Sequence, residues 1–202
     1  MDPAKFLYAP MILLNNRKHE YDFCLKNSIL TNFNYLEFGV WEGNSINHMA
    51  SSKYFPKNKI FHGFDTFEGL PEEWDMGHQI IKKGHFKVKE IPKVKSNVRL
   101  HKGLFKETLP EWKKNYYEPI CFMNIDCDLY SSTKQVLCIL NELIVKDTLI
   151  RFDDFFDSPI NPYSKWLEGQ WKALIEWIQE FNRIILPVAR SWKNGCTIKV
   201  LK

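Results

Sequence analysis

A short apolar run that ends in an acid and a glycine turn constrains the fold of this chain most. Residues 35–38 are apolar except for the glutamate at the third position, and Gly39 and Gly43 frame the turn that follows. Apolar residues then recur at helical spacing, and Asn44 or Ser45 is placed to cap that helix. A buried strand that passes through a glycine turn into a helix is typical of an α/β sheet.

This glycine turn has the features of a ligand-binding turn. Glycines let backbone N–H groups come close to a ligand, and the helix N-terminus adds a partial positive charge. The spacing is Gly-x-x-x-Gly and not the Gly-x-Gly-x-x-Gly of dinucleotide enzymes, so a pyrophosphate is not expected. Glu37, just before the first glycine, favours a ligand with an ammonium group. The alternative is a purely structural turn, since many such turns carry two glycines.

The rest of the chain alternates strands and helices. Further strands are expected at residues 59–65, 97–102, 120–126, 148–152, 183–188 and 196–201. Helices are expected at residues 16–27 and 109–116, from Ser131 or Ser132 to Ile144, and at residues 169–181. The turn at Asn194-Gly195 predicts that the last two strands form an antiparallel hairpin. The pattern predicts an α/β fold with a mostly parallel seven-stranded sheet and helices on both faces.

The length of the chain suits one domain spanning residues 1–202. Residues 1–34 are expected to form an N-terminal helical arm that covers one side of the sheet. Such arms also dimerise in some enzymes, so a homo-oligomer is possible. Residues 69–96 lose regular periodicity and contain six lysines. A connection of this length in a compact domain is usually functional or mobile, and we expect it to form a lid over the ligand site.

Charge and cysteine content exclude several classes of function. The net charge of +4 is too small for a dedicated binder of nucleic acid or of membrane surfaces. No apolar run has the length of a membrane span. The five cysteines are irregularly spaced and include no Cys-x-x-Cys, which suggests neither a disulfide framework nor a zinc site. We therefore expect a cytoplasmic protein with a small-molecule ligand, and neither nucleic acid nor membrane as a partner.

Acidic residues lie at or just past the ends of several expected strands, and this shared position is the strongest functional signal. In open parallel sheets, ligands bind at the carboxyl ends of the strands. Several carboxylates at one such edge repel one another unless a cation or a positively charged ligand lies between them. The acids in question are Glu37, Asp65, Asp126, Asp128, Asp153 and Asp154.

Two of these acids follow early strands and suit a single organic ligand. Glu37 is placed to meet an amine, and Asp65 is placed to meet a ribose. Asp65 lies 22 residues after Gly43, close to the spacing at which Rossmann-like sheets place a ribose-binding carboxylate. The structural alternative for Asp65 is an Asx-turn or a helix cap.

Three acids on later strands suit a metal ion. Asp126, Asp153 and Asp154 would offer oxygen ligands to a hard divalent cation, which favours Mg²⁺ over Zn²⁺. Each has a structural alternative as well, because Asp153 or Asp154 can cap the following turn. Asp128 can similarly cap the helix that follows Tyr130.

Five blocks of sequence, taken together, resemble a known enzyme family. They are residues 37–45, 63–71, 103–110, 125–133 and 152–154. In this order they resemble the macrocin O-methyltransferase (TylF-like) family. These are S-adenosylmethionine-dependent enzymes with the Rossmann-like class I methyltransferase fold, and they methylate sugar hydroxyls on macrolides and aminocoumarins. The resemblance covers about residues 35–200.

The resemblance implies a role for specific residues. The methionine part of S-adenosylmethionine would be held by Glu37, Gly39, Gly43 and Ser45. The ribose would be held by Asp65, with Thr66 and Phe67 beside the adenosine. Mg²⁺ would be held by Asp126, Asp153 and Asp154, and Asp126 would also act as the base. Asn44 departs from the family pattern, since a second glycine is common there, and the chain is short before the first strand.

The activity that the resemblance implies is Mg²⁺-dependent methylation of a hydroxyl on a sugar or a glycosylated small molecule. A vicinal diol is the expected acceptor, because two adjacent hydroxyls chelate the metal best. A catechol-like diol would need the same metal geometry, so the sequence leaves that acceptor open. A non-catalytic Rossmann-like binding module is a further alternative. A nucleic-acid methyltransferase is disfavoured by the low charge and by the lack of an Asn-Pro-Pro-Tyr type motif.

Overall fold

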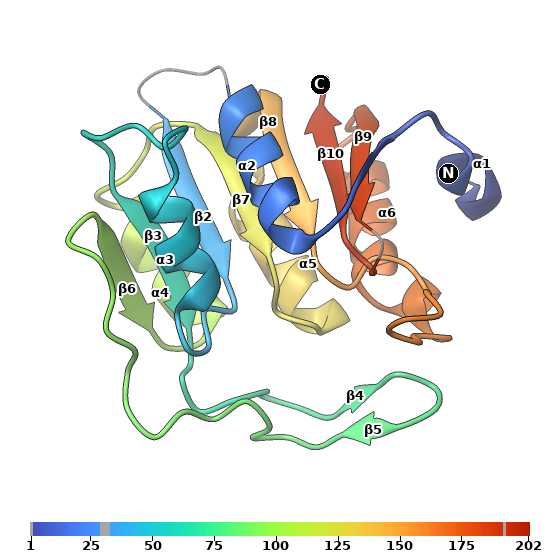
Figure 1. Ribbon diagram of the computed structural model, residues 1–202, viewed down its shortest axis with the longest axis horizontal. Helices are drawn as coiled ribbons and strands as arrows, with labels where there is room; N and C mark the ends of the chain where they lie inside the picture. The colour runs from blue at the N-terminus through green and yellow to red at the C-terminus, as the bar shows by residue number, and fades with distance from the viewer. Residues whose placement is uncertain (1, 29–32, 192) are drawn as a thin grey trace.

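The computed structural model describes residues 2–28, 33–191 and 193–202, and its centre is an eight-stranded sheet (Figure 1). The strand order is β1-β9-β10-β8-β7-β2-β3-β6. These strands are β1 (Ile12–Leu14), β2 (Asn34–Phe38), β3 (Phe61–Asp65), β6 (Val98–Lys102), β7 (Ile120–Ile125), β8 (Ile144–Phe152), β9 (Ile185–Ser191) and β10 (Cys196–Val200). A separate two-stranded ribbon pairs β4 (Trp74–Asp75) with β5 (Ile80–Ile81).

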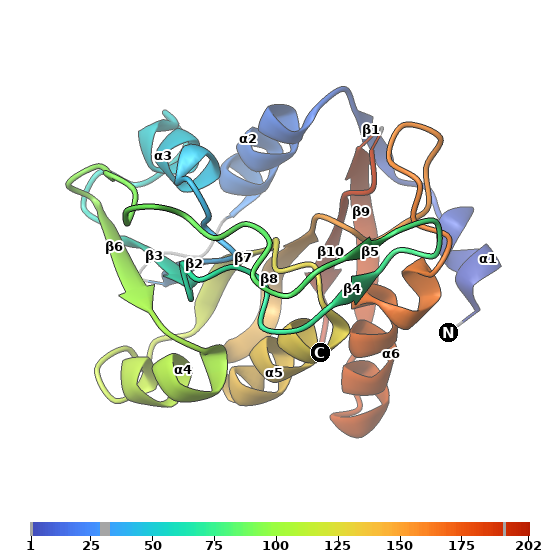
Figure 2. The ribbon, with the colours of Figure 1, turned by 90° about the horizontal axis from the view of Figure 1, so that it is seen from below.

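Helices cover both faces of the sheet. They are α1 (Pro3–Leu7), α2 (Arg17–Asn27), α3 (Asn44–Ser51), α4 (Phe105–Lys113), α5 (Tyr130–Ile139) and α6 (Gln170–Glu180), with short 3-10 turns at Asn141–Leu143 and Trp166–Glu168. Figure 2 shows α2 and α3 on one face, and α4, α5 and α6 on the other. Among the described residues, no helix combines the length and apolar character that crossing a bilayer requires.

The strand directions confirm the expected fold class. β10 runs antiparallel to both of its neighbours, β8 and β9, whereas the other paired strands of the large sheet are parallel. All seven expected strands are present. An eighth, β1, extends the edge by pairing in parallel with residues 189–191 of β9. Three residues are too few to show a strand's alternation, so β1 escapes prediction from the sequence.

Several element boundaries differ from the expected ones. Helix α4 begins at Phe105, four residues early, because Phe105, Leu109 and Trp112 recur at helical spacing and are all buried. Helix α5 ends at Ile139, and the apolar residues after Leu143 belong to β8, since a short apolar run fits a helix face and a buried strand equally well. Residues 1 and 29–32 of the expected arm lie outside the described residues.

The predicted helix caps are wrong at two places. The residue that caps α3 is Gly43, in place of Asn44 or Ser45, and the tight turn gives it a φ of 79°. Leu129 precedes α5, where a serine was expected. Neither helix has a hydrogen bond from the side chain of its cap residue, which leaves first-turn N–H groups available to water or a ligand.

The core consists of apolar side chains on both faces of the sheet. One cluster lies against α4, α5 and α6 and includes Leu137 and Trp177, and the other lies against α2 and α3 and includes Cys24 and Met49. Strand β7 is buried throughout, as expected of a central parallel strand.

The strand order reverses between β2 and β7, and this reversal determines where a ligand site is expected. From β2 the chain moves outward to β3 and β6, then returns to β7 and continues to β8. Ligands of open α/β sheets bind at the carboxyl ends of strands beside such a reversal. In Figure 1 these ends point downward, and the segment that carries β4 and β5 crosses below them.

Gly39 lies where the ends of β2 and β7 come closest. Its φ of 88° falls in the left-handed region, and a Cβ there would be 1.8 Å from the backbone oxygen of Asp126. The Asp126 N–H donates to the carbonyl of Phe38 at 2.8 Å, so the two strand ends are bonded directly. No side chain fits at residue 39.

We expect Gly39→Ala to destabilise the fold more than Gly84→Ala. Gly84 has a similar φ of 81° but no atom within 4 Å of its Cβ position, so both variants carry the same backbone strain. The steric overlap at residue 39 should add about 1–3 kcal/mol, which is the usual cost of overpacking. Thermal unfolding measures the difference, and equal shifts for the two variants would contradict the close approach of β2 and β7.

Candidate active site

A cavity of about 760 Å³ opens at the carboxyl ends of the central strands. Small-molecule sites usually measure about 300–1,000 Å³, so this one has room for a sizeable ligand. The early strands contribute Gly39, Ser45, Asp65 and Thr66 to its wall. The later strands contribute Asp126, Asp128, Asp153 and Asp154. Residues 69–96 contribute an apolar wall that includes Leu70, Trp74, Met76 and Ile81.

Three residues that were expected at the cofactor are not among the described residues that line the cavity. Glu37 is fully buried on β2. Gly43 ends the turn that precedes α3. Phe67 is 3% exposed and packs in the core cluster beneath α2 and α3. The fold therefore brings most of the glycine turn and the aspartates to one cavity, and the roles of Glu37, Gly43 and Phe67 at the cofactor stay a prediction.

Asp65 connects the end of β3 to the glycine turn. Its Oδ2 accepts hydrogen bonds from the backbone N–H groups of Val40 and Trp41, both at 2.8 Å. Its Oδ1 accepts one from Phe67 at 2.7 Å, which is the Asx-turn foreseen as the structural alternative. Asp65 also lines the cavity, so its contact with a ribose stays a prediction.

Glu37 is a buried carboxyl with an unused oxygen. The Asn124 amide donates to its Oε1 at 2.8 Å, whereas Oε2 has no hydrogen-bond partner within the part of the chain that the structure describes. Burial raises the pKa of Glu37 to about 8, although hydrogen bonds from Ser45 and Asn124 act in the opposite direction. A buried polar atom without a partner is costly, so Oε2 suits a ligand that carries a hydrogen-bond donor.

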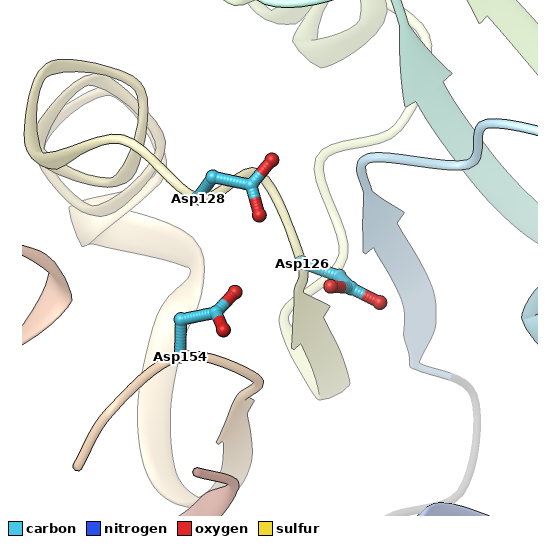
Figure 3. A group of neighbouring side chains, drawn as sticks. All are labelled: Asp126, Asp128 and Asp154. Carbon is cyan, nitrogen blue, oxygen red and sulfur yellow. The ribbon is translucent and has the colours of Figure 1, made fainter. Parts of the chain in front are cut away.

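Asp126, Asp128 and Asp154 form a group whose ligand atoms all lie within 4.8 Å of one another. Figure 3 shows the three side chains on the loops that follow β7 and β8. Burial, reinforced by the neighbouring carboxylates, raises the pKa of all three, that of Asp154 to about 7. Crowded carboxyls of this kind keep their protons until a cation replaces them.

The backbone at Asp128 is unusual. Asp128 has a φ of 60°, and the Leu129 N–H donates to the carbonyl of Cys127 at 2.6 Å, which closes a tight turn. Asp128 does not cap α5, since Leu129 is the cap residue and no side-chain bond is present there. Non-glycine residues with positive φ concentrate at functional sites, where neighbouring structure holds them in place.

The Asp153 carboxylate forms ion pairs with two arginines. The side chain of Arg17 donates to its Oδ2, and Arg151 donates to its Oδ1 at 2.6 Å. Burial alone would raise the pKa of Asp153, but the two positive charges outweigh it and hold the pKa below its ordinary value. The observed group therefore contains Asp128 where the sequence predicts Asp153, and the predicted metal ligands stay a prediction.

Arg151 connects the site to helix α2. It is 1% exposed and donates to Glu20 Oε2 from two nitrogens, at 2.8 and 3.0 Å, and to Asn124 Oδ1 at 2.8 Å. It also stacks over the ring of Tyr21, 4.9 Å from the ring centroid. A chain of contacts therefore runs from Glu20 on α2 through Arg151 and Asn124 to Glu37.

No sequence motif indicates the polar residues that surround the aspartates. Asn124 and Arg151 each interrupt an apolar strand, and that interruption is a usable signal for a buried polar partner. Glu20 and Arg17 carry no such signal, because they lie on a mostly polar helix.

Comparison with known proteins identifies relatives of the chain. The family model for macrocin O-methyltransferase (TylF) matches residues 14–162. None of the curated proteins matches significantly. The calicheamicin methyltransferase CalS11 has a similar structure, with a TM-score of 0.71 at 20% identity over 90% of this chain and 77% of that chain. The O-methyltransferase NovP has a TM-score of 0.66 at 19% identity, over 92% of this chain and 80% of that chain.

A third similar structure is the mycinamycin-pathway methyltransferase MycE, solved in complex with Mg and SAH. Its TM-score is 0.56 at 18% identity, and the match covers 91% of this chain and 49% of that chain. Residues 14–162 include the glycine turn, the five aspartates that line the cavity and the five sequence blocks. The chain therefore belongs to the macrocin O-methyltransferase (TylF) family and is an S-adenosylmethionine-dependent O-methyltransferase.

Proposed function

We propose that this enzyme methylates a hydroxyl of a sugar or a glycosylated small molecule in a Mg²⁺-dependent reaction. The observation that carries the proposal is the group Asp126, Asp128 and Asp154, which shares one cavity with the glycine turn. Two similar structures support the acceptor class. CalS11 is described as a TDP-rhamnose 3'-O-methyltransferase, and MycE was solved with Mg, SAH and mycinamycin VI.

S-Adenosylmethionine fits the early-strand side of the cavity. The unpaired, buried Oε2 of Glu37 suits the ammonium of its methionine part, which Gly39, Gly43 and Ser45 would also hold. Asp65, with Thr66 and Phe67 nearby, would hold the ribose and adenosine. When bound, this cofactor supplies the electrophilic methyl group.

Mg²⁺ fits the later-strand side, because the clustered donors there are carboxylates only. Asp126 and Asp154 would hold the ion, with a third carboxylate from Asp128 or Asp153. When bound, the ion supplies a Lewis acid that lowers the pKa of an acceptor hydroxyl. Asp126 would accept the hydroxyl proton at a carboxylate oxygen, which makes it the general base.

The cavity walls would supply the rest of the rate enhancement. Leu70, Trp74 and Met76 from residues 69–96 pack with Leu129 and Tyr163 into an apolar cluster. As a lid, this cluster would keep bulk water from the reacting atoms. Holding the hydroxyl close to the methyl group contributes about 7 kcal/mol or more in well-oriented reactions. A vicinal diol is the preferred acceptor, since both of its oxygens can approach the carboxylate-held cation.

Asp126→Asn should abolish methyl transfer while S-adenosylhomocysteine still binds, because the variant loses both a metal ligand and the base. Excess EDTA should have the same effect on the wild type, and added Mg²⁺ should reverse it. Transfer of labelled methyl to diol-bearing sugars measures the activity, and calorimetry measures binding. Asp147→Asn, in the first half of β8 and not among the residues that line the cavity, is the matched control. Full activity of Asp126→Asn, or of the wild type in EDTA, would exclude the metal role.

Glu37→Gln should weaken the binding of S-adenosylhomocysteine at least tenfold, because the amide lacks the charge that pairs with an ammonium. Calorimetric titration measures this effect. The exposed Glu42 lies in the same turn, so Glu42→Gln is the matched control. Unchanged affinity in Glu37→Gln would remove Glu37 from the cofactor site.

The same Glu37→Gln variant should be more stable than the wild type when no ligand is present. The pKa of Glu37 is about 8 in the folded state, above the ordinary 4.5, so its burial costs stability increasingly as pH rises between these values. The cost grows by up to about 1.4 kcal/mol per pH unit. Denaturant unfolding should therefore show the variant's advantage growing from pH 5 to pH 8, and a constant difference would contradict this pKa.

A further inference from the structure

The position of Arg17 is fixed by three local features of the N-terminal segment. Strand β1 pairs with β9, and only Asn15 and Asn16 separate it from α2. The Asn16 side chain caps α2 by accepting a hydrogen bond from the His19 N–H at 2.9 Å. One turn further on, Glu20 forms a fully buried ion pair with Arg151. Arg17 therefore begins a helix that is anchored on both sides of it.

From this position Arg17 bridges two of the aspartates in the cavity. Its Nη2 pairs with Oδ2 of Asp153, and its Nη1 lies 3.9 Å from Oδ2 of Asp126. The Arg17 side chain is 47% exposed, whereas that of Arg151 is 1% exposed. Arg17 can therefore leave the aspartates for solvent, but Arg151 cannot.

Arg17 and a divalent cation would need the same oxygens. A guanidinium that faces a carboxylate oxygen prevents that oxygen from ligating a metal, and the two positive charges repel each other at this distance. We propose that Arg17 is an exchangeable internal cation, which neutralises Asp153 in the metal-free enzyme and is displaced when a divalent cation binds. This inference rests on the metal dependence proposed above.

The displacement accounts for the difference between the observed carboxylate group and the ligands that the family resemblance implies. While Arg17 is in place, Asp153 is ion-paired, and the grouped carboxylates are Asp126, Asp128 and Asp154. Once Arg17 withdraws, Asp153 keeps Arg151 on its other oxygen and its contact with the Asp126 carboxyl. Asp153 is then available to join Asp126 and Asp154.

Calorimetric titration with Mg²⁺ at fixed pH, in the presence of S-adenosylhomocysteine, tests the proposal. Arg17→Gln should bind Mg²⁺ about tenfold more tightly than the wild type, a coupling of ordinary size for two sites that interact. Lys18→Gln is the matched control, since Lys18 lines the same cavity and forms no ion pair with these aspartates in the described residues. It should stay within about twofold of the wild type, because general electrostatic effects are screened by solvent and salt.

A double-mutant cycle shows whether Arg17 acts through Asp153. The gain from Arg17→Gln should shrink when Asp153→Asn is already present, because Asp153 is the nearer of the two carboxylates that Arg17 faces. Thermal scans of each variant establish that it is folded. Equal Mg²⁺ affinities for Arg17→Gln and wild type, an equal gain in Lys18→Gln, or an undiminished gain beside Asp153→Asn would each overturn the proposal.

The experiment also separates this inference from the assigned reaction. If no variant binds Mg²⁺, the exchange of Arg17 for a metal is excluded. S-Adenosylhomocysteine binding and methyl transfer in EDTA, measured on the same samples, would then show whether the methyltransferase activity stands without a metal.

Discussion

Buried negative charge at the carboxyl ends of β7 and β8 is the constraint on which the rest of the site depends. Four aspartates lie there within one cavity, and burial makes each charge costly unless a positive group is near. Arg151 offsets part of this charge from inside the core, and its pairing with Glu20 also holds α2 against the sheet. The carboxyl groups of Asp126, Asp128 and Asp154 suit a cation that enters from solvent and replaces their protons. The arginine that offsets charge in the site therefore also holds helix α2 in position.

Much of the fold could be predicted because its signals are local in sequence. Strand β7 is a continuous apolar run, so its place at the centre of a parallel sheet follows from its composition. The acids at the ends of β3, β7 and β8 meet because parallel strands end at one edge. Gly39 is required because β7 passes too close for a side chain. The candidate site could be located this way, since position after a strand determines which edge a residue reaches.

Interactions between distant parts of the chain could not be predicted. Arg17 and Asp153 are 136 residues apart, and no sequence pattern around Arg17 indicates that Asp153 is its partner. Whether Asp128 or Asp153 joins Asp126 depends on a tight turn with positive φ and on the arginines that face Asp153, and neither is visible in residue types alone. Strand β1 forms only because β9 offers an open edge. These features depend on contacts between residues that are far apart in the sequence. The periodicity of apolar residues gives no information about such contacts.

A crystal structure with S-adenosylhomocysteine and Mn²⁺, whose anomalous signal locates the ion, tests the account most directly. We expect the cofactor product in the cavity with its amino group at Glu37, and the ion between Asp126 and Asp154. We also expect Arg17 to have left Asp153. An ion bound away from these carboxylates, or a cofactor product bound away from the glycine turn, would contradict the account.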